Sequence, residues 1–338
     1  MDSSTPLLSL KHMDMVYESR YSLFSKPLRV GAALDINLDI HPGEVIAMVG
    51  ESGCGKTTIG QVIIGMLKPT GGHMYYKGKD VKTLNKKEKH AYRNEVQLVQ
   101  QNSYAALNPV KTISHSLLDP IIHKGLVKNR REALERVSEV LRMVEINPED
   151  IDKYPHELSG GQRQRILMAR AILMKPKLIV ADEPLSMIDV SLRVSILNLM
   201  TKLNQTLGIA FLYITHDFGT AKYIAKSGKI AIMYLGKMVE YGAVGDVLKR
   251  PSHPYLQALL TAVPVPDPEI AKIRRELPLK SIDMPSAAAP PPGCRFHPRC
   301  PYAVELCEQN EPQLIPFKES LCACHRAADV PPWSLYGH

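Results

Sequence analysis

Residues 45–57 decide the fold, and they read Val45-Ile46-Ala47-Met48-Val49-Gly50-Glu51-Ser52-Gly53-Cys54-Gly55-Lys56-Thr57. The five apolar residues at the start suit a short strand that is buried on both faces. A glycine-rich loop follows, and the residues from 56 to 67 are predicted to form a helix. Glycines let a backbone approach a phosphate closely, and a helix N-terminus offers free N–H groups to it. The stretch therefore predicts a parallel α/β fold with a phosphate-binding loop.

Each part of this loop has an expected role. Lys56 is expected to reach the β- and γ-phosphates of ATP, and the Thr57 hydroxyl to ligate Mg²⁺. A glycine turn with a surface lysine is the alternative for the pattern alone, and the strand before it and the helix after it favour the phosphate loop. The predicted nucleotide-binding residues here are Gly50, Glu51, Ser52, Gly53, Cys54, Gly55, Lys56, Thr57 and Thr58.

The rest of the chain alternates between strand and helix patterns. Residues 7–40 alternate apolar and polar side chains, which predicts an antiparallel β subdomain. Apolar positions at helical spacing predict an amphipathic helix over 126–146. Buried strands over 178–181 and 209–214, with a helix over 190–207 between them, predict a parallel sheet. The proline-rich segments 264–268 and 285–292 are interpreted as linker.

Composition excludes several classes of protein. The net charge of +8 is scattered along the 338 residues, which favours a solvated surface, and no nucleic-acid partner is expected. The apolar runs are far shorter than the roughly 20 residues of a spanning helix. The first five residues carry no export signal, so the chain is expected to stay in the cytoplasm.

Two carboxylates and a histidine follow the later strands. Asp182 and Glu183 come directly after the strand over 178–181, where an acidic residue holds the Mg²⁺ shell of a nucleotide. We expect Asp182 to act on the metal through water and Glu183 to polarise or position the attacking water. A helix N-cap is the alternative, and the phosphate loop upstream favours catalysis. His216 follows the strand over 209–214 and is expected to contact the γ-phosphate rather than to be merely structural.

A second glycine motif carries a family resemblance. Leu158-Ser159-Gly160-Gly161-Gln162-Arg163-Gln164-Arg165 stands about 20 residues before the paired carboxylates. A serine and two glycines that open a helix make another anion-binding N-terminus. The motif resembles the signature of ABC transporter ATPases. The resemblance implies that two subunits pair head to tail, so that one subunit's signature covers the other's phosphate loop. The residues implied to act in trans are Ser159, Gly160, Gly161 and Gln162.

Further positions resemble the family one by one. Tyr17 resembles the aromatic residue that stacks on adenine, with a core or surface tyrosine as the alternative. Gln101 resembles the glutamine that reaches Mg²⁺ and senses the membrane subunit. Gln100 competes for that role because residues 100–103 depart from the usual Phe-Gln-Asp-Pro. Asp189 resembles a residue of the loop that crosses the dimer interface, although residues 186–189 depart from the commoner Ser-Ala-Leu-Asp. The implied Mg²⁺ ligands are Thr57, Gln101 and Asp182.

The C-terminal part narrows the resemblance. Residues 253–268 and 293–303 are similar to the C-terminal region of oligopeptide and dipeptide importer ATPases. Four cysteines there are separated by five, six and sixteen residues, which is not a zinc-ribbon spacing, and Cys322 is spare. The resemblance implies a [4Fe-4S] cluster, with structural zinc and reduced thiols as alternatives. The implied cluster ligands are Cys294, Cys300, Cys307 and Cys324.

The expected fold class is therefore α/β, with a P-loop NTPase core of the ABC type. It carries an N-terminal antiparallel β subdomain, a helical subdomain over about 101–156 and a small cysteine-rich extension. We expect a nucleotide-binding domain over 1–260 and the extension over 261–338. The expected cofactors are ATP, Mg²⁺ and a [4Fe-4S] cluster.

The resemblance implies an ATP-hydrolysing subunit that powers an importer of peptides. Oligosaccharide or nickel import is the alternative, and a soluble ABC ATPase of nucleic-acid metabolism or a non-hydrolysing regulatory cassette is the rival. The implied partners are a second, related ATP-binding subunit, two transmembrane permease subunits and an extracytoplasmic substrate-binding protein. The implied location is the cytoplasmic face of the cell membrane, bound to the permease.

Overall fold

The computed structural model describes residues 5–19, 28–263 and 279–333. Its N-terminal part is a four-stranded antiparallel sheet in the order β2-β1-β4-β5. These strands are β1 (Leu8–Ser19), β2 (Leu28–Ile40), β4 (Gly71–Tyr76) and β5 (Lys79–Asp80). Ile36, Leu38 and Ile40 of β2 are buried, and the polar residues between them are partly exposed. The predicted alternation and antiparallel pairing are confirmed.

A larger mixed sheet forms the centre of the molecule. Its eight strands run in the order β11-β12-β10-β9-β3-β8-β7-β6. The five neighbours from β9 to β6 are parallel, as predicted, and the remaining pairs are antiparallel. The strands are β3 (Val45–Val49), β6 (Val96–Val99), β7 (Leu178–Asp182), β8 (Ala210–Thr215), β9 (Lys229–Tyr234), β10 (Lys237–Ala243), β11 (Ile315–Phe317) and β12 (Ser320–Cys322).

Both faces of the central strands are covered. Ile46 and Met48 of β3 belong to one buried cluster, which the strand shares with the antiparallel sheet and α1 (Lys56–Ile63). Ala47 and Val49 belong to a second cluster on the opposite face, together with residues of several helices. Burial on both faces explains why β3 reads as a continuous apolar run.

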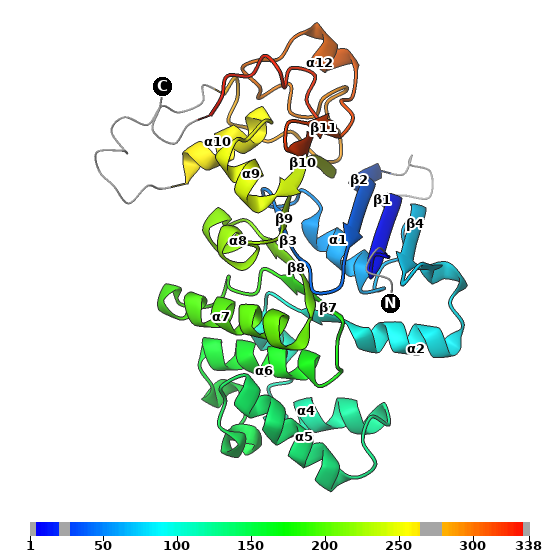
Figure 1. The fold of residues 1–338 in the computed structure, drawn as a ribbon, viewed down its shortest axis with the longest axis vertical. Helices are drawn as coiled ribbons and strands as arrows, with labels where there is room; N and C mark the ends of the chain where they lie inside the picture. Colours follow the sequence, from blue (N-terminus) through cyan, green and yellow to red (C-terminus); the bar gives the residue numbers. More distant parts are fainter. Residues whose placement is uncertain (1–4, 20–27, 264–278, 334–338) are drawn as a thin grey trace.

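Helices surround the sheet, and Figure 1 shows α4 and α5 at the end of the molecule opposite α12. They are α2 (Lys86–Glu95), α3 (Ser103–Ala106), α4 (Ile113–His123), α5 (Arg130–Met143), α6 (Gly160–Ile172), α7 (Val190–Leu207), α8 (Phe218–Ile224), α9 (Val244–Lys249), α10 (Pro254–Ala262) and α12 (Glu305–Gln309). Short 3₁₀ turns lie at Val81–Thr83, Pro148–Asp152 and Pro155–Glu157. Residues 101–156 are thus mainly helical, while the predicted domain boundaries stay a prediction.

Two predicted helices are shorter than expected. The helix predicted over 56–67 ends at Ile63, because Gly65 adopts a left-handed conformation with φ of 74°. The helix predicted over 126–146 begins after Asn129, whose side chain accepts a hydrogen bond from the N–H of Glu132. By contrast, α7 has the predicted bounds of 190 and 207.

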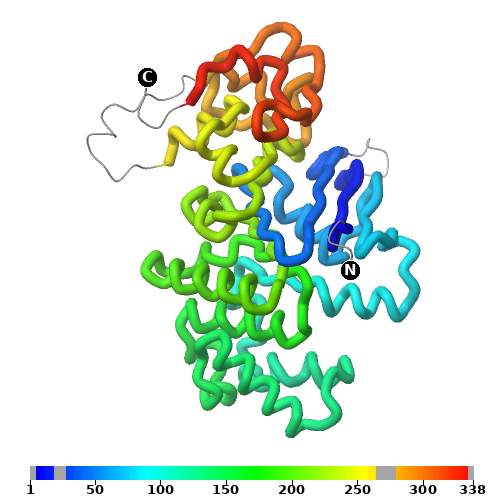
Figure 2. The backbone as a smooth tube through the Cα atoms, viewed as in Figure 1, coloured from blue at the N-terminus to red at the C-terminus, as the bar shows by residue number. Residues whose placement is uncertain are grey.

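The C-terminal extension contributes strands to the central sheet. Strand β12 pairs with β10, so that Glu240 lies opposite Cys322, and β11 pairs with β12. The sequence analysis did not predict these two strands. Figure 2 shows the same continuity, with the orange and red extension lying directly beside the yellow helix α10.

The two proline-rich segments have different outcomes. Residues 264–268 lie outside the described part of the chain. Residues 285–292 contain no helix or strand, as predicted, but Ala287 packs against the core. This segment is therefore part of the folded extension and not a free spacer.

Candidate functional site

The loop between β3 and α1 has the backbone that a phosphate loop requires. Gly55 caps α1 with a φ of 104°, a conformation that favours glycine. A Cβ on Gly55 would lie 1.9 Å from the carbonyl oxygen of Ala32, and one on Gly50 would lie 2.2 Å from that of Met233. Neighbouring backbone therefore excludes any larger residue at these two glycines.

The Lys56 side chain lies inside this loop. Its side chain is buried, and Nζ donates hydrogen bonds to the carbonyl oxygens of Gly50 at 2.7 Å and Glu51 at 2.9 Å. Cys54 is also buried, with its sulfur 3.6 Å from Lys56 Nζ, and burial raises the pKa of this thiol. The cysteine packs with the cluster beneath the loop, whereas Ser52 and Gly53 are exposed. Cys54 therefore contributes to the buried cluster, and Lys56 stabilises the loop through its hydrogen bonds to the loop carbonyls.

The parallel strands bring Thr57 and Asp182 together. Strand β8 lies between β3 and β7, so their carboxyl ends share one edge of the sheet. The Thr57 hydroxyl donates a hydrogen bond of 3.1 Å to Oδ1 of Asp182, and Thr58 is partly buried beside it. Burial raises the pKa of the Asp182 carboxyl, the Thr57 hydrogen bond lowers it, and Glu183 raises it further. A hydroxyl and a carboxylate at this distance are an oxygen donor set that suits Mg²⁺.

Glu183 lies at the centre of a second group. His216 Nδ1 is 3.2 Å from Glu183 Oε1, and Gln101 Nε2 donates a hydrogen bond of 3.3 Å to Oε2. Glu183 has a φ of 43°, rare for a residue with a side chain, and its N–H donates to the carbonyl of Ile214 at 2.9 Å. The structure thus joins three residues predicted from separate parts of the chain. Gln101 makes this contact with Glu183, and its role at Mg²⁺, for which Gln100 is the alternative, stays a prediction.

The signature motif opens α6 as predicted. Ser159 caps the helix: its hydroxyl accepts from the N–H of Gln162 at 3.2 Å, and Gln162 Oε1 accepts from the N–H of Ser159 at 2.9 Å. Gly160 lies against the loop over residues 186–189, where a Cβ would be 3.2 Å from the carbonyl oxygen of Met187. Gly161 is buried and Ser159 is exposed, so the serine end of the helix faces outward.

Two predicted residues lie at the surface. Asp189 precedes α7 and is exposed. Tyr17 lies on β1 opposite Val30, and 39% of its surface is exposed. Their roles at the dimer interface and on adenine stay predictions.

Two residues that were not predicted from the sequence contact the phosphate loop. Arg299 of the extension forms an ion pair with Glu51, and the Tyr255 hydroxyl accepts a hydrogen bond from the N–H of Glu51. No local pattern pointed to either residue, because more than 200 positions separate them from the loop.

Four cysteines line one small cavity in the extension. They are Cys294, Cys300, Cys307 and Cys324. Burial raises the pKa of Cys294 to about 11 and that of Cys324 to about 12. Cys322 lies instead on β12 and does not line this cavity. Within the described ranges, no group of three or more His, Cys, Asp and Glu side chains is arranged to hold a metal ion, so this arrangement supports neither the predicted cluster nor the zinc alternative.

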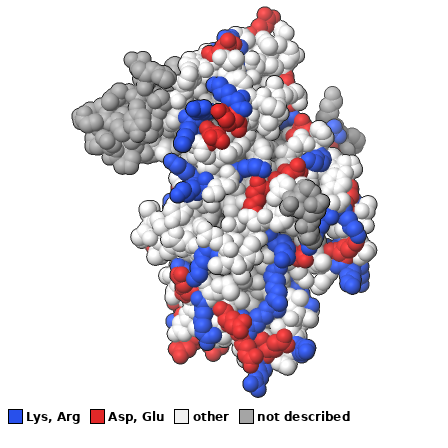
Figure 3. Space-filling view, in the orientation of Figure 1, with Lys and Arg blue, Asp and Glu red and all other residues white. Residues whose placement is uncertain are grey.

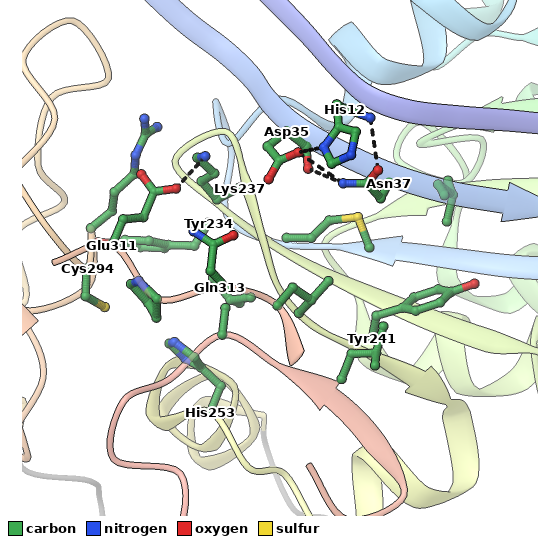
Figure 4. A pocket seen from close by; sticks show the side chains of 18 of the residues that line it. His12, Asp35, Asn37, Tyr234, Lys237, Tyr241, His253, Cys294, Glu311 and Gln313 are labelled. Carbon is green, nitrogen blue, oxygen red and sulfur yellow. Dashed lines mark hydrogen bonds and ion pairs between the residues drawn. The ribbon is translucent and has the colours of Figure 1, made fainter. Parts of the chain in front are cut away.

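A larger cleft of about 500 Å³ separates the antiparallel sheet from the extension (Figure 4). Polar side chains pair at its edges: His12 Nδ1 lies 2.7 Å from Asp35 Oδ1, and Lys237 forms an ion pair with Glu311 at 2.5 Å. On the face drawn in Figure 3, basic and acidic side chains are likewise interspersed. The described residues that line the cleft include none of the predicted nucleotide-binding residues.

Comparisons with known proteins agree with this geometry. Residues 33–186 match the ABC transporter family, and residues 239–307 match the family described as oligopeptide/dipeptide transporter, C-terminal region. The dipeptide transport ATP-binding protein DppF of Haemophilus influenzae is 40% identical over 95% of this chain and 97% of its own length.

Solved structures of ABC transporter proteins are similar to this chain as well. A dimeric ATP-binding cassette in a post-hydrolysis state, bound to ADP and Pi, has a TM-score of 0.61 and 28% identity, and covers 70% of this chain and 98% of its own. The cbiO1 protein of Clostridium perfringens, part of an ABC transporter complex, has the same TM-score with 25% identity over 72% of this chain and 91% of its own. No helix in the described part of the chain is long and apolar enough to cross a membrane. The chain belongs to the ABC transporter ATP-binding proteins, and its C-terminal region is that of the oligopeptide/dipeptide transporters.

Proposed function

We propose that this chain is the ATP-hydrolysing subunit of an importer of peptides. The observation that carries the proposal is the convergence of Thr57 with Asp182, and of Gln101 and His216 with Glu183, at one edge of the parallel sheet. The names of relatives, which include dipeptide transport and peptide import, favour peptides over oligosaccharide or nickel.

The proposed reaction is in-line attack of water on the γ-phosphorus of ATP, in which the bond to the β–γ bridging oxygen breaks and ADP and inorganic phosphate are released. Glu183 accepts the water's proton, and His216 and Gln101 hold the carboxylate in place. Thr57 and Asp182 would hold the Mg²⁺ that accompanies ATP, and the ion would supply neutralisation of phosphate charge. Lys56 then turns from its own loop carbonyls to the β- and γ-phosphates.

The complete site is proposed to need two subunits. The exposed N-terminus of α6 at Ser159 offers a second phosphate-binding surface, and the solved relative bound to ADP and Pi is dimeric. We propose a related second ATP-binding subunit as partner, bound beneath two permease subunits on the cytoplasmic face of the membrane. An extracytoplasmic binding protein would then deliver the substrate.

Transport itself is the test of the substrate class. The chain would be reconstituted with its permease, second ATPase subunit and binding protein in liposomes, and ATP hydrolysis and uptake measured with di- and oligopeptides, oligosaccharides and Ni²⁺. Peptides are expected to stimulate hydrolysis and to accumulate, with the Glu183→Gln complex as the inactive control. If only an oligosaccharide or only Ni²⁺ stimulated ATP hydrolysis and accumulated, peptide would not be the transported substrate.

We further propose that the four cysteines of the extension hold a [4Fe-4S] cluster with a structural role. Four thiols around one cavity are the donor set that such a cluster uses. The cavity itself measures about 10 Å³, so the side chains must turn outward before a cluster enters.

Iron content tests this second proposal. Chain purified without oxygen is expected to be brown with about four iron atoms each, and Cys300→Ser is expected to lose most of them. Cys322→Ser is the matched control, because Cys322 is buried outside the cavity, and it should keep its iron. Colourless, iron-free wild-type protein would refute the cluster.

A further inference from the structure

Arg299 of the C-terminal extension forms an ion pair with Glu51, the second residue of the phosphate loop. Its guanidinium donates two hydrogen bonds to the Glu51 carboxylate, with Nη1 2.9 Å from Oε2 and Nη2 3.2 Å from Oε1. The side chain of Arg299 is only 7% exposed, and that of Glu51 is 29% exposed. A forked pair with one partner buried is among the stronger hydrogen-bonded contacts in proteins, and its geometry is specific to arginine.

The surroundings hold Arg299 in place. Its guanidinium carbon lies 5.8 Å from the ring centre of Tyr234 and 5.6 Å from that of Phe296. Its backbone N–H donates to the carbonyl of Phe296 at 3.0 Å. Tyr255, on α10, makes the second contact with the loop, because its hydroxyl accepts from the Glu51 N–H at 3.1 Å. Both the side chain and the backbone of Glu51 are therefore held by residues beyond position 250.

The negative charge of Glu51 lies within the predicted phosphate loop, where it can affect the binding of a negatively charged nucleotide. Lys56 Nζ, which is expected to bind phosphates, is 2.9 Å from the carbonyl oxygen of this same glutamate. A carboxylate released from Arg299 would be free to turn toward that ammonium group and to compete with ATP for it. It would also repel the negatively charged phosphates directly. Arg299 both neutralises this carboxylate and directs it toward the extension.

We propose that Arg299 is a positioning residue for ATP binding, which keeps the Glu51 carboxylate away from the phosphates and so makes ATP affinity depend on the C-terminal extension. The inference rests on the proposed role of residues 50–57 as the phosphate loop. It predicts that the extension does more than stabilise the fold.

Binding of a fluorescent, non-hydrolysable ATP analogue tests the proposal. Arg299→Met is expected to weaken binding about tenfold, from the loss of a charged, forked contact. The double variant Arg299→Met with Glu51→Gln is expected to recover affinity to within about threefold of wild type, because the freed charge is gone. Arg299→Lys keeps the charge without the fork and should fall between wild type and Arg299→Met. The matched control is Arg250→Met, which removes an exposed ion pair with Glu319 at the same extension and should bind normally.

The outcomes separate the two proposals. If the wild-type chain binds no ATP analogue, the proposed function itself fails. If wild type binds and Arg299→Met binds equally well, only the positioning role fails. A loss that Glu51→Gln does not rescue would also overturn it, since a general loss of packing has no reason to respond to the partner's charge. If Arg299→Met melts below the assay temperature, Arg299→Lys alone and together with Glu51→Gln makes the same comparison.

Discussion

Glu240 should make the stability of the extension fall as pH rises. This carboxylate is fully buried on β10 and accepts hydrogen bonds from the N–H groups of Ser252 at 3.0 Å and His253 at 2.8 Å. Burial raises its pKa from 4.5 to about 7, although those two N–H groups and Ser320 lower it in part. Between pH 4.5 and about 7, the Glu240 carboxyl group is deprotonated in the unfolded chain but still protonated in the folded chain. Stability attributable to Glu240 is therefore present below pH 4.5 and is lost as pH rises toward 7.

The size of the effect follows from the two pKa values. Raising the pH from 5 to 8 should remove roughly 2 to 3 kcal/mol of unfolding free energy through Glu240 alone. His253 acts in the opposite direction, because burial lowers its pKa to about 3 and its stability contribution is lost as pH falls below 6.5. Cys322 faces Glu240 across the strand pair, and burial raises the pKa of that thiol, so it stays neutral over this range. The raw pH profile is thus a sum of opposing contributions.

The assay therefore compares wild type with Glu240→Gln, which leaves His253 unchanged. Urea unfolding would be followed at pH 5, 6, 7 and 8 through Trp333, the chain's single tryptophan, which packs against the core in the extension. The variant should gain stability relative to wild type by roughly 2 to 3 kcal/mol between pH 5 and 8. Glu308→Gln, at an exposed carboxylate of the same extension, is the control and should show no such trend. Parallel profiles for wild type and Glu240→Gln would refute the reasoning.

Two substitutions test the nucleotide site. Gly55→Ala should lower ATP affinity by at least about tenfold, because its Cβ would lie 1.9 Å from the Ala32 carbonyl oxygen and its φ is 104°. Gly53 also has a positive φ, of 78°, but a Cβ there meets nothing within 4 Å, so Gly53→Ala carries the backbone strain without the clash and should bind ATP more tightly than Gly55→Ala; equal affinities in a filter-binding assay would contradict this. Asp182→Asn should keep ATP binding without Mg²⁺ but reduce Mg²⁺-dependent hydrolysis by about 100-fold, and a wild-type rate would remove Asp182 from the metal site.

Local patterns were sufficient where neighbouring residues decide the structure. The apolar run at 45–49, the glycines after it and the capped helix at Ser159 all depend on a few adjacent residues, and they were predicted correctly. Strands β7 and β8 were predicted to within one residue at each end, as 178–181 and 209–214, because each is a continuous apolar run.

Contacts between distant residues were not predictable in this way. Strands β11 and β12 have only three residues each, too few to show a period, and β12 is placed by pairing with β10. The contacts of Arg299 and Tyr255 with Glu51 span 248 and 204 residues. A helix end was misplaced for a more local reason, since the left-handed conformation of Gly65 is not evident from the apolar pattern around it.

The most direct test of the central claim is the response of Glu183→Gln to ATP. The glutamine keeps the shape and removes the carboxylate that lies 3.2 Å from His216, so hydrolysis should fall by at least about 100-fold while ATP binding persists. The variant should then form a stable ATP-dependent pair of subunits, detected by sedimentation and absent with ADP. Hydrolysis at the wild-type rate, or no pairing at saturating ATP, would contradict the assignment of Glu183 and the shared site.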